Sequence, residues 1–241
     1  PVKDAPVVQR LTAQGALPVA KANLQEFSYG ILGDASAYGR VINPRDPEVC
    51  GGGSSSGSAA LVACGALDLT VGSDSAGSVR VPAACQGILG FKPTFGLIPV
   101  EGVFPFAPSF DCIGFFASSV DLIEQAFIAT ADEEPATAQD VSTIDVTALK
   151  AKGERFADLL AKLETSDFEL SEGVDLEETI AVTAKLYEPI RLKEVYDVHR
   201  PLLDQHDKYQ DIILQRVLGG ENISQENYDA AAQGVEKLRE E

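Results

Sequence analysis

The sequence predicts an α/β fold in which helices cover a central sheet. In the first 130 residues, short apolar runs that suit buried strands alternate with amphipathic stretches that suit helices. After residue 130, polar segments with helical spacing predominate. Apolar residues make up 45% of the 241-residue chain, which is ordinary for a protein with a packed core. The chain therefore divides into a Gly- and Ser-rich core section, 1–130, and a helix-rich continuation, 131–241.

The elements of the first section rest on local patterns. A helix is expected at 5–13, where an apolar stripe ends before Gly15. A short apolar run predicts a buried strand at 17–20, and a helix is expected at 58–65, where apolar residues follow a run of serines. The remaining expected elements are strands at 67–71 and 88–91, the turns that close them at 72–74 and 92–96, and an amphipathic helix at 119–132.

The second section reads as helices separated by a linker. Residues 135–147 are rich in Ala and Thr and predict the linker. Helical spacing predicts helices at 148–163, 177–198 and 224–240, with one more short strand at 168–170.

Charge and hydropathy narrow the function classes. The chain has 37 acidic and 19 basic residues, a net charge of −18, which disfavours nucleic acid or anionic lipid as the main partner. No apolar run is long enough to span a bilayer, and the N-terminus has no signal pattern. We therefore expect a cytoplasmic protein without a nucleic-acid or membrane partner.

The cysteines are spaced too widely for a familiar metal or redox motif. There are four, at positions 50, 64, 85 and 112, and none forms a C-x-x-C pair. Their small or apolar surroundings predict reduced and mostly buried thiols rather than a metal site or a disulfide framework.

The stretch GGGSSSGS, residues 51–58, admits several interpretations. A phosphate-binding loop would need a lysine before its last serine, and none is present. The pattern G-x-S-x-G matches a nucleophile elbow, but turn-like residues precede it instead of a strand. A triad would also need a histidine, and His199 and His206 lie in polar helical segments that favour solvent-facing or capping roles. A flexible linker is disfavoured because a helix begins inside the tract.

Two dense motifs carry a resemblance to a known family. They read GGGSSSGSAALVACG from Gly51 and GSDSAGSVRVPAACQGILGFKPTFG from Gly72. They resemble the signature of the amidase signature family of serine hydrolases, approximately G-G-S-S-[GS]-G-S followed by G-[ST]-D-x-[GA]-G-S-[IVG]-R-x-P-[AS]. With its flanking segments the resemblance covers about residues 4–130. It implies a layered α/β/α fold with a central mixed sheet and extra helices in the C-terminal half.

The resemblance implies roles for individual residues. Ser78 would be the nucleophile, and Ser54, which the family holds with a cis peptide, would relay its proton. The backbone N–H groups of Ser75, Ala76, Gly77 and Ser78 would form the oxyanion hole, where fixed donors stabilise the tetrahedral intermediate. Small residues in this loop allow the backbone to approach the substrate carbonyl.

The other polar residues of the two motifs are expected to support the loops. Asp74 and Arg80 would brace the nucleophile loop rather than take part in the chemistry. Ser55, Ser56 and Ser58 would form loop hydrogen bonds or cap the helix.

The third catalytic member in the family is a neutral lysine, which exchanges a proton through the bridging serine. Lys3 lies in a similar V-K-D context, but its register places it downstream of the family's lysine strand. Lys21 and Lys92 match positions that look structural in the family. Because the sequence starts at Pro1 and contains no Met, we expect it to be a piece of a longer polypeptide with the catalytic lysine before Pro1.

Four features resemble the allophanate hydrolase branch of the family, whose members cleave a small urea-derived acid: the triple serine, Ala76, the pair Asp111-Cys112 and the stretch TAKLYEPIRLKEVY. In that branch Tyr187 matches a tyrosine implicated in holding the substrate carboxylate. The matching arginine position is Val195, which cannot bind a carboxylate. Arg191, one helical turn away, is the candidate replacement.

The resemblance therefore predicts an amidase that cleaves a small amide or urea-derived substrate through a serine acyl-enzyme. Two alternatives stay open. One is an amidotransferase A subunit, which uses the same triad, depends on glutamine and requires a partner. The other is a non-catalytic member used for binding or assembly, if the full protein lacks the lysine. No metal or organic cofactor is implied, and a homodimer is left open.

Overall fold

The computed structural model describes residues 3–133, 143–147, 150, 153–173 and 176–240. The chain forms two compact units, Pro1–Pro135 with Ile190–Gln225, and Ala136–Pro189 with Glu226–Glu241. Residues 190–225, which belong to the helix-rich section of the sequence, thus pack with the first unit.

The first unit is built around a three-stranded antiparallel sheet. Its strands are β1 (Leu69–Asp74), β3 (Cys112–Ala117) and β2 (Leu89–Phe91), in the order β1-β3-β2. Ala117 of β3 lies opposite Leu69 on one side and Leu89 on the other. Every residue of β3 is buried, as expected for a central strand rich in Ile and Phe.

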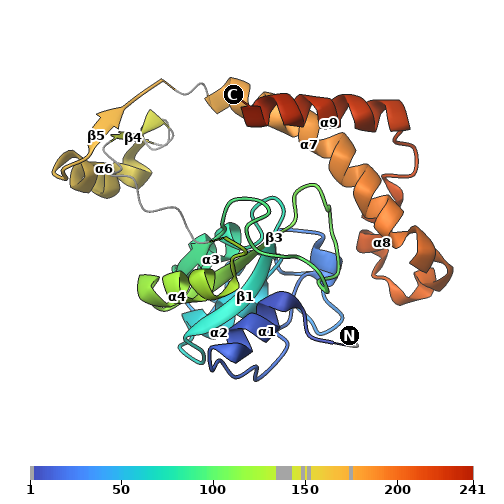
Figure 1. The fold of residues 1–241 in the computed structure, drawn as a ribbon, viewed down its shortest axis with the longest axis horizontal. Helices are drawn as coiled ribbons and strands as arrows, with labels where there is room; N and C mark the ends of the chain where they lie inside the picture. The colour runs from blue at the N-terminus through green and yellow to red at the C-terminus, as the bar shows by residue number, and fades with distance from the viewer. Residues whose placement is uncertain (1–2, 134–142, 148–149, 151–152, 174–175, 241) are drawn as a thin grey trace. The chain divides into compact units, whose positions relative to one another are not determined.

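Helices cover both faces of this sheet (Figure 1). Because side chains alternate along a strand, adjacent residues of β3 enter different cores. Phe115 packs with Val7 and Ala126 of one core, whereas Phe116 packs with residues such as Ala59 in the other. The first core involves α1 (Pro6–Ala13) and α4 (Val120–Thr130), and the second α2 (Ser56–Ala63) and α3 (Arg80–Gln86).

The predicted layered α/β/α class is confirmed by this arrangement. A mixed sheet was expected, whereas the described sheet of the first unit is antiparallel on both sides of β3. Parallel pairing occurs instead in the second unit, between β4 (Thr143–Asp145) and β5 (Glu169–Ser171).

A third core of the first unit joins segments that are distant in sequence. Tyr29 and Phe106 come from loops, whereas Val195 lies in α7 (Leu176–His199) and Ile213 in α8 (Asp211–Leu218). The loop of Tyr29 follows the short helix η1 (Glu26–Ser28), and η3 (Arg200–Lys208) connects α7 to α8.

The second unit contains the β4–β5 pair and several helices. These are η2 (Gly153–Phe156), α6 (Ala157–Glu164), the first part of α7 and most of α9 (Gln225–Glu240). The two long helices pack closely, because a Cβ added at Gly234 of α9 would lie 2.5 Å from Leu186 Cδ2 of α7.

Most expected elements are confirmed within a few residues. They are the helices 5–13, 58–65, 119–132, 177–198 and 224–240, and the strands 67–71, 88–91 and 168–170. The helix expected at 148–163 is found in its second half as α6, and residues 148–149 and 151–152 lie outside the described residues.

Three expectations are wrong. Residues 17–20 form no strand, because Leu17 and Val19 are exposed to solvent and none of the described strands pairs with them. Residues 72–74 continue β1 by pairing with β3 instead of turning. The linker expected at 135–147 includes β4, and its residues 135–142 lie outside the described residues.

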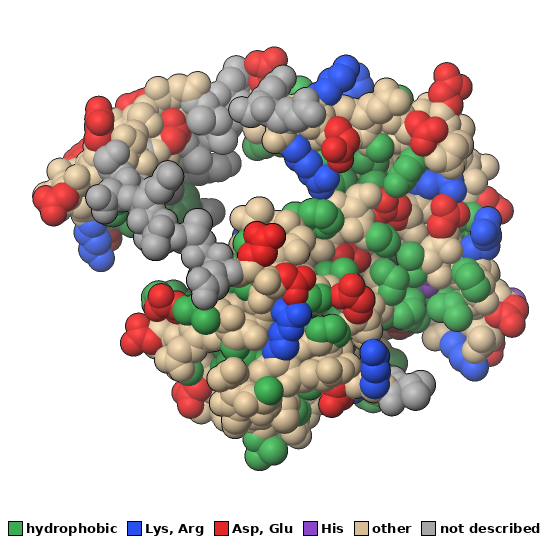
Figure 2. All heavy atoms as spheres, viewed as in Figure 1, with side chains coloured by type: hydrophobic (Ala, Val, Ile, Leu, Met, Phe, Trp, Pro, Cys, Tyr) green, Lys and Arg blue, Asp and Glu red, His purple; other side chains and the backbone are tan. Residues whose placement is uncertain are grey.

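Charged side chains of both signs are spread over the face drawn in Figure 2, with acidic ones more frequent. No helix in the described part of the chain combines the length and the apolarity that crossing a bilayer requires.

Candidate active site

The two serine-bearing loops lie side by side in the first unit. The Ser55 N–H donates to the Ser78 carbonyl oxygen over 3.2 Å, which holds the end of one loop against the other. The Gly53–Ser54 peptide is cis. Ser54 is fully buried and Ser78 is 9% exposed, so both hydroxyls sit where bulk water has little access.

The Ser54 hydroxyl is the feature of this site that its surroundings do not explain. Within the described residues its Oγ has no hydrogen-bond partner, although its backbone oxygen accepts from Gln25 N at 3.0 Å. Leaving a buried hydroxyl unpaired costs about 1–3 kcal/mol. Because such groups are rare in native proteins, this one indicates a role other than stability.

The neighbouring serines have structural partners instead. Ser55 Oγ donates to the Ser73 carbonyl and accepts from the Ser73 N–H, both at 3.2 Å. Ser58 Oγ donates to Val71 O at 2.9 Å, and Ser56 Oγ to Ser54 O at 3.4 Å. These bonds fit the loop-bonding role expected for them, and they tie the start of α2 to β1.

Asp74 braces the loop that ends in Ser78. Its fully buried carboxylate accepts hydrogen bonds from the backbone N–H groups of Gly77 (2.7 Å) and Val79 (3.0 Å). The Arg80 guanidinium adds two bonds, from Nε at 3.0 Å and from Nη2 at 2.8 Å. Burial alone would raise the pKa of Asp74, but the bonds from Arg80, Val79 and Gly77 outweigh it and hold the pKa below its usual value.

The proposed oxyanion donors are not equally available in this conformation. The Gly77 N–H donates to Asp74 Oδ1. An oxyanion hole in this loop would therefore rely first on the N–H groups of Ser75, Ala76 and Ser78. The Ser75 side chain is fixed by a 2.5 Å bond to Asp111 Oδ1. The loop is thus held from both sides before any substrate binds.

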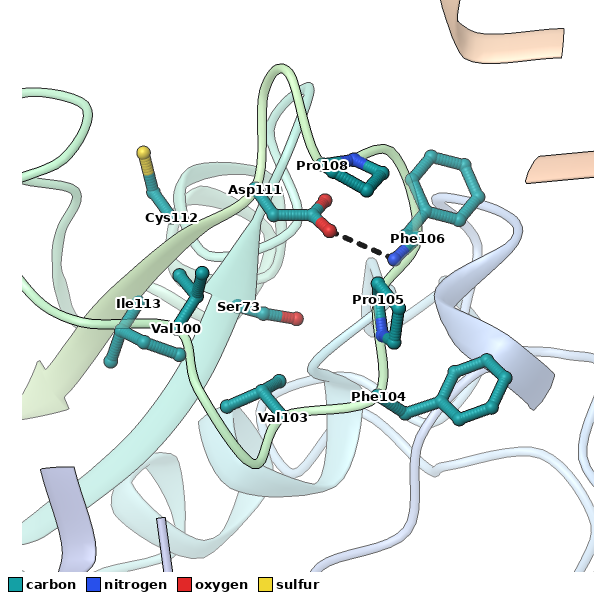
Figure 3. Close-up of a pocket in the computed structure, with 10 residues that line it drawn as sticks. All are labelled: Ser73, Val100, Val103, Phe104, Pro105, Phe106, Pro108, Asp111, Cys112 and Ile113. Carbon is teal, nitrogen blue, oxygen red and sulfur yellow. Dashed lines mark hydrogen bonds between the residues drawn. The ribbon is translucent and has the colours of Figure 1, made fainter. Parts of the chain in front are cut away.

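Asp111 is a supporting residue whose role the spacing of the sequence could not predict. It lies far from Ser75 in the chain, and its carboxylate also accepts from the N–H groups of Phe106 (2.8 Å) and Ala107 (3.0 Å). Only the pairing of β1 with β3 brings it beside the nucleophile loop. Figure 3 shows its carboxylate turned toward Phe106.

Asp111 also lines a small pocket next to this loop (Figure 3). The pocket has a volume of about 50 Å³, and Ser73 and Asp111 supply its polar side chains. Its other lining residues are Val100, Val103, Phe104, Pro105, Phe106, Pro108, Cys112 and Ile113.

The candidate carboxylate-binding residues lie in α7. Val195 is fully buried in the third core of the first unit, where it packs as an apolar residue. Arg191 donates to the Tyr29 hydroxyl at 2.5 Å and stacks on the Tyr29 ring with its Cζ 5.4 Å from the centroid. Tyr187 is half-buried and lies in the part of α7 that belongs to the second unit.

No described lysine hydrogen-bonds to the Ser54 hydroxyl, which has no partner among the described residues. Lys3 and Lys21 are exposed. Lys92 donates to Pro93 O at 2.7 Å and contacts Cys112 Sγ at 3.8 Å, in keeping with a structural role.

Two expectations about other polar residues need correction. His206 is exposed as expected, but His199 is 1% exposed, because it closes an aromatic cluster at the end of α7. The cysteines are mostly exposed rather than buried, since Cys50, Cys64 and Cys85 are in contact with solvent and Cys112 alone of the four is buried.

Comparisons with known proteins show the family of this chain. A family model described as Amidase matches residues 1–164. Among curated relatives, the A subunit of the Glutamyl-tRNA(Gln) amidotransferase of Symbiobacterium thermophilum is 48% identical over 136 residues, which are 56% of this chain and 28% of that protein. AtzE, the 1-carboxybiuret hydrolase subunit of Pseudomonas sp. (strain ADP), is 43% identical over 132 residues, covering 55% of this chain and 29% of that protein.

Solved structures show the same fold over nearly the whole chain. A crystal structure of an amidase superposes with a TM-score of 0.85 at 30% identity, covering 97% of this chain and 55% of the other. A structure of the Kluyveromyces lactis allophanate hydrolase superposes with a TM-score of 0.85 at 26% identity, covering 99% of this chain and 43% of the other. The chain spans between about a quarter and a third of the length of these curated relatives. On the family match over more than half of its residues, this chain belongs to the amidase signature family.

Proposed function

We propose that this chain forms the serine-bearing core of an amidase that hydrolyses the C–N bond of a small amide or urea-derived substrate. The observation that carries the proposal is the pairing of the two serine loops through Ser55 and Ser78, with a buried Ser54 hydroxyl that has no partner in the described part of the chain. A serine nucleophile needs a neighbouring group that accepts its proton. The spare hydrogen-bonding capacity of Ser54 suits that relay.

The chemistry is assigned as acyl transfer. Ser78 Oγ attacks the substrate carbonyl while its proton passes toward Ser54, and backbone N–H groups of the loop stabilise the oxyanion. Collapse of the tetrahedral intermediate expels the amine and leaves an acyl-enzyme on Ser78, which water hydrolyses. The family resemblance assigns the final proton exchange to a lysine.

The size of the pocket beside Ser75 favours a small substrate. Among the similar proteins, the allophanate hydrolase and AtzE of the 1-carboxybiuret hydrolase suggest a urea-derived acid. Tyr187 is kept as the proposed substrate-binding residue. Because Val195 is buried as core, a carboxylate would need Arg191 instead, with release of its bond to the Tyr29 hydroxyl.

The nucleophile is tested with the natural polypeptide that contains this chain. A fluorophosphonate probe, which reacts with activated serines, is expected to label the peptide that carries Ser78, and the natural polypeptide is expected to release ammonia from a panel of small amides and urea derivatives. Ser78→Ala is expected to abolish both signals while the fold is retained by circular dichroism. Ammonia release that persists in Ser78→Ala would contradict the assignment of Ser78 as the nucleophile.

The relay is tested with Ser54→Ala. We expect kcat to fall by about 10²–10⁴-fold, the usual range for general acid–base catalysis. Stability should stay the same or rise, because the substitution removes an unpaired buried hydroxyl. Ser58→Ala is the matched control: it loses the bond to Val71 O, so its free energy of unfolding should fall by about 1 kcal/mol while kcat is kept. Equal kcat values for the two variants contradict the relay.

The sequence identity between this chain and amidotransferase A subunits favours a second candidate function, that of a glutamine-dependent subunit. Turnover of allophanate by the isolated polypeptide, without glutamine-dependent transfer, favours the hydrolase. Activity that appears only with partner subunits and glutamine favours the amidotransferase. If no probe labels Ser78 and the sequence upstream lacks the lysine, the non-catalytic alternative holds.

A further inference from the structure

Two cysteines that are distant in sequence meet beside the Ser54 loop. Cys50 directly precedes the tract 51–58, and Cys85 lies in the last turn of α3. A single side-chain nitrogen, Asn43 Nδ2, donates to the carbonyl oxygens of both Cys50 (3.3 Å) and Cys85 (3.1 Å). One residue further along each segment, Gln86 Nε2 donates to Gly51 O at 2.7 Å. The two backbones are therefore held next to each other.

The side chains of the pair are also close and accessible. The Cys50 side chain lies close enough to that of Cys85 to raise the pKa of the Cys85 thiol. A Cβ added at Gly52 would lie only 3.1 Å from Cys85 Sγ, so this sulfur lies directly against the tract. Both cysteines are exposed to solvent. Within the described residues, no group of three or more His, Cys, Asp or Glu forms a metal-binding cluster, so this is a two-thiol site.

We propose that Cys50 and Cys85 form a redox-sensitive pair that closes to a disulfide on reaction with a low-molecular-weight disulfide such as oxidised glutathione. Closure ties the tract that carries Ser54 to the end of α3, the helix that begins two residues after Ser78. Such reversible disulfides are the kind that occurs in reducing compartments.

The exchange proceeds in two balanced steps. The Cys50 thiolate attacks one sulfur of oxidised glutathione, which forms a mixed disulfide and releases one glutathione thiolate. The Cys85 thiolate then attacks the Cys50 sulfur, which forms the protein disulfide and releases the second glutathione. The protein loses two electrons and two protons, and two glutathione thiols are formed.

The order of attack follows from the electrostatics of the pair. Cys85 is exposed overall, but the desolvation of its partly covered thiol raises its pKa, and the charge of Cys50 raises it further. The thiolate is the form that reacts, so the raised pKa of Cys85 disfavours it as the first nucleophile. This assigns the first attack to Cys50 and the resolving step to Cys85.

The link is mapped in a Cys64→Ser variant, because the tryptic peptide 46–80 otherwise contains both Cys50 and Cys64. After incubation with oxidised glutathione and alkylation of the remaining thiols, non-reducing mass spectrometry is expected to find this peptide joined to the one that begins at Val81. Fragmentation should place the link on Cys85, and dithiothreitol should reverse it. Recovery of Cys50 and Cys85 only as free thiols, or only as separate glutathione adducts, overturns the proposal.

A second variant tests the order of attack with the same probe. In Cys85→Ser the resolving thiol is gone, so glutathione is expected to stay on Cys50 as a mixed disulfide. The assigned order is overturned if Cys50 carries no glutathione in Cys85→Ser and Cys85 does carry it in Cys50→Ser. Cys64 of the unaltered protein is the control: its thiol donates to Leu61 O, so it should form an adduct with glutathione but no internal link.

Discussion

At the scale of the residue, Asp74 joins stability to the shape of the nucleophile loop. Asp74→Asn keeps the volume but replaces an acceptor oxygen with an amide donor that would face the N–H groups of Gly77 or Val79. We expect the free energy of unfolding to fall by about 1–3 kcal/mol. The loss should stay below that of a fully buried ion pair, because the Arg80 side chain is 54% exposed. Urea titration of Asp74→Asn and of the unaltered protein at neutral pH measures this loss of stability.

Asp132→Asn is the matched control for Asp74→Asn. Asp132 pairs with Arg10 at 2.6 Å on the surface, where an ion pair contributes at most about 1 kcal/mol. The difference in free energy of unfolding between the unaltered protein and Asp74→Asn should depend on pH. Because the folded-state pKa of Asp74 lies below the ordinary value of 3.8, the carboxylate's contribution is complete above that value and is lost as the pH falls through the folded-state pKa. A constant difference between the protein and Asp74→Asn from pH 7 to pH 3 would contradict this account.

At the scale of the element, the start of α2 depends on the small residues of the serine tract. The Gly57 N–H donates to Asn23 O at 2.9 Å, and a Cβ added at Gly57 would lie 2.4 Å from that same oxygen. Gly57→Ala therefore forces the helix away from the neighbouring segment. We expect the free energy of unfolding to fall by about 1–3 kcal/mol, the usual cost of overpacking, in spite of the better helix propensity of Ala.

Ala60→Ser, a half-buried position of the same helix, is the control for Gly57→Ala. Its expected cost is under about 1 kcal/mol, since it adds one atom and changes helix propensity only slightly. Denaturant midpoints of the two variants, compared at equal m-values, show whether Gly57→Ala loses more stability than Ala60→Ser. If Gly57→Ala is as stable as the unaltered protein, the close packing at Asn23 is not a constraint.

The elements that the sequence could predict are those with a strong local signal. The helices α1 and α4 carry an apolar stripe, and Ser119 accepts from Leu122 N as the N-cap of α4. The strand β3 was missed because its continuous apolar run has no alternation to mark it, although it is the centre of the sheet. The helix α3 was missed because its residues belong to the motif that was interpreted as an active-site loop.

The site was predictable to the extent that its motifs are local. Ser54 and Ser78 were found from two dense motifs, but their hydrogen-bonded contact through Ser55 depends on the packing of α2 against the sheet. Asp111 was noted only as part of the Asp111-Cys112 pair, and its bond to Ser75 could not be predicted because strand pairing brings the two residues together. Long-range partners are set by tertiary structure, which local patterns do not encode.

At the scale of the whole molecule, His199 connects segments from both ends of the first unit. It is buried, its Nδ1 lies 2.8 Å from the Tyr209 hydroxyl, and its ring contacts that of Phe27 at a centroid distance of 4.6 Å. Its Nε2 has no hydrogen-bond partner among the described residues. Charging this ring in the folded state would therefore place a proton on a nitrogen in apolar surroundings.

The stability of the first unit should consequently depend on pH through His199. Burial lowers the pKa of His199, and the opposing charge of Glu26 does not cancel this effect. With a depressed folded-state pKa, the contribution to stability is complete above the ordinary value of 6.5 and is lost as the pH falls below it toward the folded-state pKa. Within that window each pH unit costs up to about 1.4 kcal/mol.

The measurement is a set of urea titrations between pH 8 and pH 5. His199→Phe is expected to be less stable at pH 8, because it leaves the Tyr209 hydroxyl without its partner, but to lose less stability on acidification than the unaltered protein. His206→Ala, at an exposed position, should keep the pH dependence of the unaltered protein. If His199→Phe and the unaltered protein lose stability equally on acidification, His199 is not the group that couples folding of this unit to pH.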